Sequence, residues 1–214
     1  LYPSIRNALH NVSSFSGGRE ASYAILRNGV VVAIPEENFF HGPIPENLGP
    51  VQQIASGQNH SLALRENGTV VGWGSDPHGA ATPPRDLQNV TAIAVGTFHS
   101  VALKEDGTVV AWGESSFQRL DVPSDLQDVI AVAAGDRHTV ALLADGSLRA
   151  WGHIPDVESI PTEPLGIAAI AAGGRHTIAL DRRGAVQIWG ATAELTPTIP
   201  SDVRVSAVFA GPHY

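Results

Sequence analysis

The sequence predicts an all-β fold, a β-propeller of four-stranded antiparallel blades, and two observations support this prediction. First, a unit of about 39 residues recurs along the chain. Second, the pieces between turn signals are about four to eight residues long and rich in β-branched residues, which is typical of strands. Short strands in units of this length are expected to stack around an axis as blades. The units begin at Val12, Val51, Val90, Val129, Ile167 and Val205.

Each unit contains the same elements in the same order. It opens with an apolar strand of small residues, such as VIAVAAG at 129–135, which we place innermost because only small side chains fit where blades converge. An alternating strand follows a histidine, as in HTVAL at 138–142. A third strand ends in Trp-Gly, and a variable segment leads back to the next unit. Between the second and third strands we expect a turn with a glycine at positive φ, at Gly29, Gly68, Gly107, Gly146 and Gly184.

The repeats predict a single propeller domain over residues 1–214. The first unit is atypical, with Ala21 in place of the histidine and Ile34-Pro35 in place of Trp-Gly, as is common in terminal repeats. Five blades that close with overlapping ends, a partial sixth blade, and a piece of a larger ring are all compatible with the sequence. The complete repeats are 12–50, 51–89, 90–128, 129–166 and 167–204, and the partial repeats are 1–11 and 205–214.

Composition excludes several classes of function. The net charge is -8 and Lys104 is the single lysine, which argues against a nucleic acid partner. No cysteine is present, so disulfides and thiolate metal sites are excluded. No apolar run approaches the ~20 residues of a membrane span, and no leader is visible. The absence of methionine suggests a processed or trimmed product.

The repeated sequence motifs resemble those of the regulator of chromosome condensation repeat family, whose units carry G-x-x-H-[ST]-x-A-L, an Asp-Gly turn and a Trp-Gly. The resemblance covers residues 12–210 with four matched copies. The compact units, with linkers such as VPSDLQDV, are most similar to bacterial members that include a β-lactamase inhibitor. Because other members include an exchange factor for a small GTPase and further recognition modules, the resemblance implies a propeller fold and does not name the partner.

The repeated histidines and tryptophans are interpreted as structural. Zinc needs ligands about 2 Å from one ion, and one histidine per blade leaves them scattered, so no metal site is predicted. Each histidine shares a strand side with apolar residues and should be buried, hydrogen-bonded and turned toward a neighbouring blade. The tryptophans are expected to pack between blades, with ligand binding at a wet edge as the alternative. These residues are His60, His99, His138 and His176, and Trp73, Trp112, Trp151 and Trp189.

Differences between the units indicate the candidate binding surface. Because strands alternate in direction, the loops after the first and third strands emerge at one end of the propeller, and their sequences vary freely. We call this end the variable face. Its aromatic and arginine residues suit a protein interface, although unconstrained solvent loops would also vary. The candidate residues are Phe39, Phe40, Asn59, Asp76, His78, Phe98, Phe117, Arg119, Asp136, Arg137 and Arg175.

The functional hypothesis is a non-catalytic recognition module that binds another protein through the variable face, as an inhibitor or regulator. No nucleophile elbow, phosphate loop or metalloprotease motif occurs, so neither an enzyme nor a cofactor is predicted. The alternative is a carbohydrate-binding propeller, which should repeat its ligating residues from blade to blade. Within AGDRHTVALLADGSLRAWG at 134–152, any specific function is expected in Asp136 and Arg137.

Overall fold

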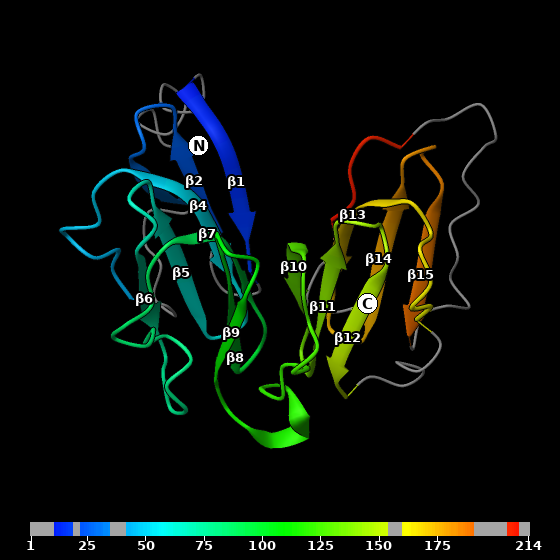
Figure 1. Ribbon diagram of the computed structural model, residues 1–214. Helices are drawn as coiled ribbons and strands as arrows, with labels where there is room; N and C mark the ends of the chain where they lie inside the picture. The colour runs from blue at the N-terminus through cyan, green and yellow to red at the C-terminus, as the bar shows by residue number, and fades with distance from the viewer. Residues whose placement is uncertain (1–10, 19–21, 35–41, 154–159, 191–204, 210–214) are drawn as a thin grey trace.

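The computed structural model describes residues 11–18, 22–34, 42–153, 160–190 and 205–209. These residues form five antiparallel three-stranded sheets, which we number as blades 1–5 in chain order (Figure 1). The strands are β1 (Val12–Gly17), β2 (Ser22–Leu26), β3 (Val31–Ile34), β4 (Val51–Ser56), β5 (His60–Arg65), β6 (Val70–Gly74), β7 (Val90–Val95), β8 (His99–Lys104), β9 (Val109–Gly113), β10 (Val129–Ala134), β11 (His138–Leu143), β12 (Leu148–Gly152), β13 (Ile167–Ala172), β14 (His176–Asp181) and β15 (Val186–Gly190). The all-β prediction is confirmed, and each blade opens at the residue where its repeat begins.

The first strand of every blade lies innermost, as its small residues predicted. Strands β1, β4, β7, β10 and β13 contact one another in chain order, and their ends line a shared cavity on the axis. Close approach explains the glycines there: a Cβ on Gly135 would collide with the carbonyl oxygen of Gly173 and with the ring of His138. The blades therefore converge at positions where a side chain does not fit.

The hydrophobic core lies between the blades. Val140 and Leu142 of β11 pack against Ile167 of β13 and Ala179 of β14, so the middle strand of blade 4 faces blade 5. Leu62 of blade 2 joins the core of blade 3 in the same way. Because the side chains of a strand alternate between faces, the middle strand packs against both neighbouring blades and is almost fully buried.

The hairpin turns match their predicted chemistry. All five predicted turn glycines have positive φ, between 76° and 87°. In blade 4, the Asp145 carboxylate accepts hydrogen bonds from the Ser147 backbone N–H at 2.8 Å and from the Ser147 hydroxyl at 2.6 Å. This closes the turn locally, as is usual for an Asp that precedes a turn glycine.

The expected fourth strand is not confirmed. Residues 75–89 and 114–128 connect blades through turns and one 3-10 turn at Ser116–Gln118, without a strand. Pro77, Pro83, Pro84 and Pro123 lie in these segments, and proline has no N–H to donate to a sheet. Ala21, Pro35 and most of the partial repeats lie outside the described residues, while 205–209 contain no strand.

Candidate functional site

The variable face is formed as predicted. In blade 4, His138 pairs with Gly152, and the His153 N–H donates to the Arg137 carbonyl at 2.7 Å. The loop after β10 and the segment after β12 therefore leave the blade side by side. The β11–β12 turn lies at the opposite end, which we call the turn face.

The repeated histidines join neighbouring blades. His99 Nε2 lies 2.9 Å from Thr139 Oγ1 of the next blade, and His60 Nε2 lies 2.8 Å from Ser100 Oγ. The Ser100 hydroxyl donates to the carbonyl of Ala80 at 2.9 Å, so it accepts its other hydrogen bond from the His60 Nε2–H. The prediction of buried, hydrogen-bonded histidines facing a neighbouring blade is thus confirmed.

Burial keeps two of these imidazoles neutral. The pKa of His99 is lowered to about 3, chiefly because desolvation penalises its charged form, with Arg119 adding repulsion. Burial likewise lowers the pKa of His138 to about 4. At neutral pH both rings are therefore uncharged structural groups between blades.

Three tryptophans have the predicted packing role. Trp73, Trp112 and Trp151 are buried. The indole N–H of Trp112 donates to the Ala80 carbonyl at 2.9 Å, and that of Trp151 donates to the Arg119 carbonyl at 3.1 Å. Each acceptor belongs to the connector that follows the preceding blade. The alternative, ligand binding by tryptophan rings at a solvent-exposed edge, is therefore wrong for these three rings, whereas Trp189 is half-buried.

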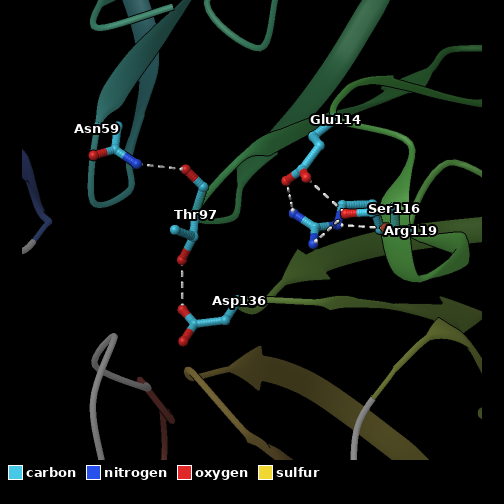
Figure 2. A network of polar contacts seen from close by, with 6 residues as sticks. All are labelled: Asn59, Thr97, Glu114, Ser116, Arg119 and Asp136. Atoms are coloured by element: carbon cyan, nitrogen blue, oxygen red, sulfur yellow. Dashed lines mark hydrogen bonds and ion pairs between the residues drawn. The ribbon is translucent and has the colours of Figure 1, made fainter. Parts of the chain in front are cut away.

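A chain of polar contacts crosses four blades near the axis, and Figure 2 shows its links from Asn59 through Thr97 to Asp136. The Asn59 amide donates to the Thr97 carbonyl at 3.1 Å, and the Thr97 hydroxyl donates to Asp136 Oδ1 at 2.6 Å. The Asp136 N–H then donates to the Gly174 carbonyl at 3.1 Å. Two predicted site residues, Asn59 and Asp136, thus have polar groups engaged within the protein. The adjacent axial cavity, of about 70 Å³, is far below the ~300 Å³ of small-molecule sites.

Arg119, a candidate partner-binding residue, is instead buried, with 1% of its surface exposed. Its Nη1 donates to Glu114 Oε2 at 3.1 Å, and its Nε donates to the Ser116 carbonyl at 2.9 Å (Figure 2). The guanidinium therefore holds the two ends of the 114–119 loop together from the buried side of the loop. Arg119 supports the variable face from inside and leaves little surface for a partner.

Phe117 lies at the tip of this loop, and 45% of its surface is exposed. The Arg137 guanidinium carbon lies 4.4 Å from the ring centroid, and the His153 ring stacks at 5.8 Å with an interplanar angle of 28°. We call these three residues the Phe117 cluster. The cluster joins three separate segments on the variable face, and sequence reasoning missed His153. Its position directly after the Trp-Gly of blade 4 was the available signal.

A hollow of about 170 Å³ adjoins the cluster. It is lined by Asp136, Arg137, His153, Gly174 and Arg175, so the Gly-x-Arg-His segments of blades 4 and 5 meet there. Both arginines are exposed. The structure thus brings Phe117, Asp136, Arg137 and Arg175 together out of the predicted residues.

The remaining candidates lie elsewhere. His78 and Phe98 form an edge-to-face pair with ring centroids 5.6 Å apart, and Phe98 is half-buried. The Asp76 carboxylate accepts hydrogen bonds from the Ala81 N–H and the Thr82 hydroxyl, at 2.8 and 2.6 Å, and so shapes its own connector. Phe39 and Phe40 lie outside the described residues.

Two further features concern only the described part of the chain. No helix there is long and apolar enough to cross a membrane. No group of three or more His, Cys, Asp or Glu residues within the same ranges could hold a metal ion.

Several solved structures resemble this one. The ectodomain of the receptor kinase CR4 from Physcomitrella patens is 21% identical, with a TM-score of 0.76 over 94% of this chain and 56% of its own. The ectodomain of ACR4 from Arabidopsis thaliana is 20% identical, with a TM-score of 0.74 over 94% and 74%. Prp20p from Saccharomyces cerevisiae is 23% identical, with a TM-score of 0.74 over 94% and 67%. The chain thus spans 56% of the first of these relatives, and no curated protein sequence matches it.

These similarities establish the propeller fold. The expected kinship with compact bacterial inhibitors receives no support from them. The model of the regulator of chromosome condensation (RCC1) repeat matches residues 51–80, 90–119, 129–153 and 167–192. These four segments contain the Gly-x-x-His, turn and Trp-Gly motifs of blades 2–5. The chain therefore belongs to the RCC1 repeat family.

Proposed function

We propose that this chain is a non-catalytic β-propeller that binds another protein through its variable face, and that binding inhibits or regulates that partner. The observation that carries the proposal is the Phe117 cluster, an exposed aromatic ring that contacts the Arg137 guanidinium and stacks with the His153 ring. Aromatic and arginine residues dominate the binding energy of protein interfaces. A cluster of this kind, held by a rigid scaffold, is suited to anchor a partner.

The conformation of the loop supports a use for Phe117. Phe117 and Gln118 have φ of 61° and 58°, in the left-handed region where such side chains are disfavoured. The bonds from Arg119 to Glu114 and Ser116 hold the loop in this conformation. Backbone strain of this kind is concentrated at functional sites.

Relatives with the same fold suggest the class of partner. Prp20p is described with its binding to Gsp1p and histones, and yeast RCC1 (Prp20) has been crystallised with Kap60. The latter structure is 24% identical to this chain, with a TM-score of 0.68. The binding of other proteins by Prp20p supports a protein partner as the proposal for this chain.

The carbohydrate alternative is less well supported. Equivalent sugar sites should repeat their ligating residues, but the loops before the histidines read Gln58-Asn59, Thr97-Phe98, Asp136-Arg137 and Gly174-Arg175. Three of the four tryptophans that could serve as platforms are buried. A non-catalytic role is supported by the histidines that hydrogen-bond across blade interfaces.

Site-specific photo-crosslinking in an extract of the source organism tests the proposal. A benzophenone amino acid replaces Ser115, exposed beside Phe117, or Glu105, exposed on the turn face as a matched control. We expect a discrete protein adduct from position 115 and none from position 105. Adducts from position 105 alone, or equally from both, would contradict the proposal.

A further inference from the structure

We infer that the variable face binds acidic side chains of its partner, whose carboxylates enter the hollow between Arg137 and Arg175 beside Phe117. The inference rests on the proposed protein-binding function and adds the chemistry of the partner. It follows from the positions of two arginines, from the hydrogen bonds and ion pair that the nearby carboxylates already make within the protein, and from the orientation of one guanidinium.

The two arginines occupy equivalent positions in adjacent blades. Arg137 and Arg175 directly precede the histidines of blades 4 and 5, and both line the hollow. Both side chains are exposed, and within the described ranges neither makes a hydrogen bond or ion pair. Their ten N–H donors, five in each guanidinium, are therefore available to a ligand.

The carboxylate of the hollow and that of the nearby 114–119 loop each have a partner of their own. Asp136 Oδ1 accepts the Thr97 hydroxyl at 2.6 Å, and Figure 2 shows its carboxylate turned toward Thr97. Glu114 forms an ion pair with Arg119 at 3.1 Å and accepts the Ser116 hydroxyl at 2.7 Å. Two guanidinium groups thus face a single carboxylate in the hollow, which leaves it net positive.

Phe117 orients the guanidinium of Arg137. The guanidinium carbon lies 4.4 Å from the ring centroid, so the cation rests over the aromatic face. A guanidinium stacked in this way keeps the N–H groups of its edge free, and those groups match a carboxylate in a two-point hydrogen bond. The His153 ring, stacked on Phe117, adds a polar edge to the same hollow.

The net charge of the whole chain favours the hollow over the rest of the surface as the place where an acidic partner binds. The net charge is -8, so most of the surface disfavours an acidic partner. A local positive hollow on an acidic protein would orient such a partner toward one face, since complementary charge directs encounter and register. An acidic loop with an adjacent apolar side chain, placed against Phe117, fits these features.

Disulfide-closed random peptide loops displayed on phage serve as the probe. Selection uses the wild-type chain, with counter-selection on the Arg137→Glu/Arg175→Glu variant. The matched control is Arg182→Glu/Arg183→Glu, two exposed arginines on the turn face. Circular dichroism and thermal unfolding verify that both variants fold. A parallel library of linear peptides with free C-termini separates side-chain carboxylates from terminal ones.

We expect enriched loops with two or more Asp or Glu residues beside an apolar residue. Their binding should weaken at least tenfold in Arg137→Gln/Arg175→Gln, weaken with added salt, and persist in the turn-face control. Neutral or basic loops that compete at the variable face would overturn the inference and leave the proposed function intact. Enrichment only of free C-termini would overturn the assignment to side chains. No enrichment over counter-selection would overturn the inference, while crosslinking tests the function separately.

Discussion

The guanidinium carbon of Arg137 lies 4.4 Å from the ring centroid of Phe117, although the two residues belong to different repeats. Arg137 precedes the second strand of blade 4, whereas Phe117 lies in the connector that follows blade 3. The contact depends on the 114–119 loop, which Arg119 holds from beneath. The candidate binding site is therefore a property of packed blades, and its stability and its binding can be tested separately.

Replacing Arg119 by Met should destabilise the protein without removing an exposed group. Glu114 would lose its ion-pair partner, and the Ser116 carbonyl would lose a donor. Because the pair is partly buried, we expect the free energy of unfolding to fall by about 2 kcal/mol. Urea unfolding followed by tryptophan fluorescence measures the change. Arg182→Met, on the exposed turn face, should remain within about 0.5 kcal/mol of wild type, and equal stability of both variants would refute the role assigned to Arg119.

The hydrogen bond between His99 and Thr139 should contribute to stability across the interface of blades 3 and 4. His99→Ala removes the bond and leaves a cavity, so we expect a loss of about 3 kcal/mol in the free energy of unfolding. A double-mutant cycle with Thr139→Val should give a coupling of about 1 kcal/mol. Strictly additive losses would show that the two side chains do not interact. His78→Ala, an exposed ring, is the control.

Lowering the pH should begin to destabilise the folded protein at pH values above those at which ordinary carboxylates titrate. The pKa values of His99 and His138 fall from 6.5 to about 3 and about 4 on folding. Since the unfolded chain binds these protons more readily, the stability from neutral burial is fully present above pH 6.5. It is lost as pH falls toward 4, by about 1.4 kcal/mol per pH unit for each ring.

Urea unfolding at several pH values between 7 and 4.5 checks this prediction. His99→Gln should reduce the slope, because only one of the two rings would remain. The pKa of Asp106 is lowered to about 2, chiefly by its hydrogen bonds with Thr108, so this carboxylate titrates below the window. A free energy of unfolding that does not change across the window would contradict the burial of neutral histidines.

Glycine at the convergence of the blades should not tolerate a side chain. A Cβ on Gly135 would meet the Gly173 carbonyl and the His138 ring, so Gly135→Ala should cost about 3 kcal/mol. Gly17 ends the inner strand of blade 1, where, among the residues that the structure describes, a Cβ would meet only Ser22 Oγ, at 3.6 Å. Gly17→Ala should therefore change stability by about 0.5 kcal/mol or less. Thermal unfolding compares the two variants, and similar melting temperatures would contradict the predicted convergence.

Features that repeat could be predicted from the sequence. The start of each blade, the innermost strand, the turn glycines and the histidine interface all followed from residue size, strand alternation and turn chemistry. The variable face also followed, because alternating strands place two of the loops at one end. Each of these features depends on residues within one unit or on a relation that every unit repeats.

Features that do not repeat could not be predicted in the same way. Whether Arg119 points outward or folds beneath its loop depends on Ser116 and Glu114, and no periodicity reports such contacts. The stacking of His153 on Phe117 joins segments from two repeats. The fourth strand was expected from the length of the repeat and of the pieces between turn signals, but the described connectors form turns instead. These outcomes depend on tertiary packing, which a single sequence does not display.

The most direct test of a protein-binding variable face is the dissociation constant for the partner identified by crosslinking. Isothermal titration calorimetry compares wild type, Phe117→Ala/Arg137→Ala and the turn-face control Arg182→Ala/Arg183→Ala. We expect the first variant to raise Kd at least thirtyfold, about 2 kcal/mol, as interface anchors do. The control should bind like wild type. A Kd within twofold of wild type for Phe117→Ala/Arg137→Ala would contradict the account.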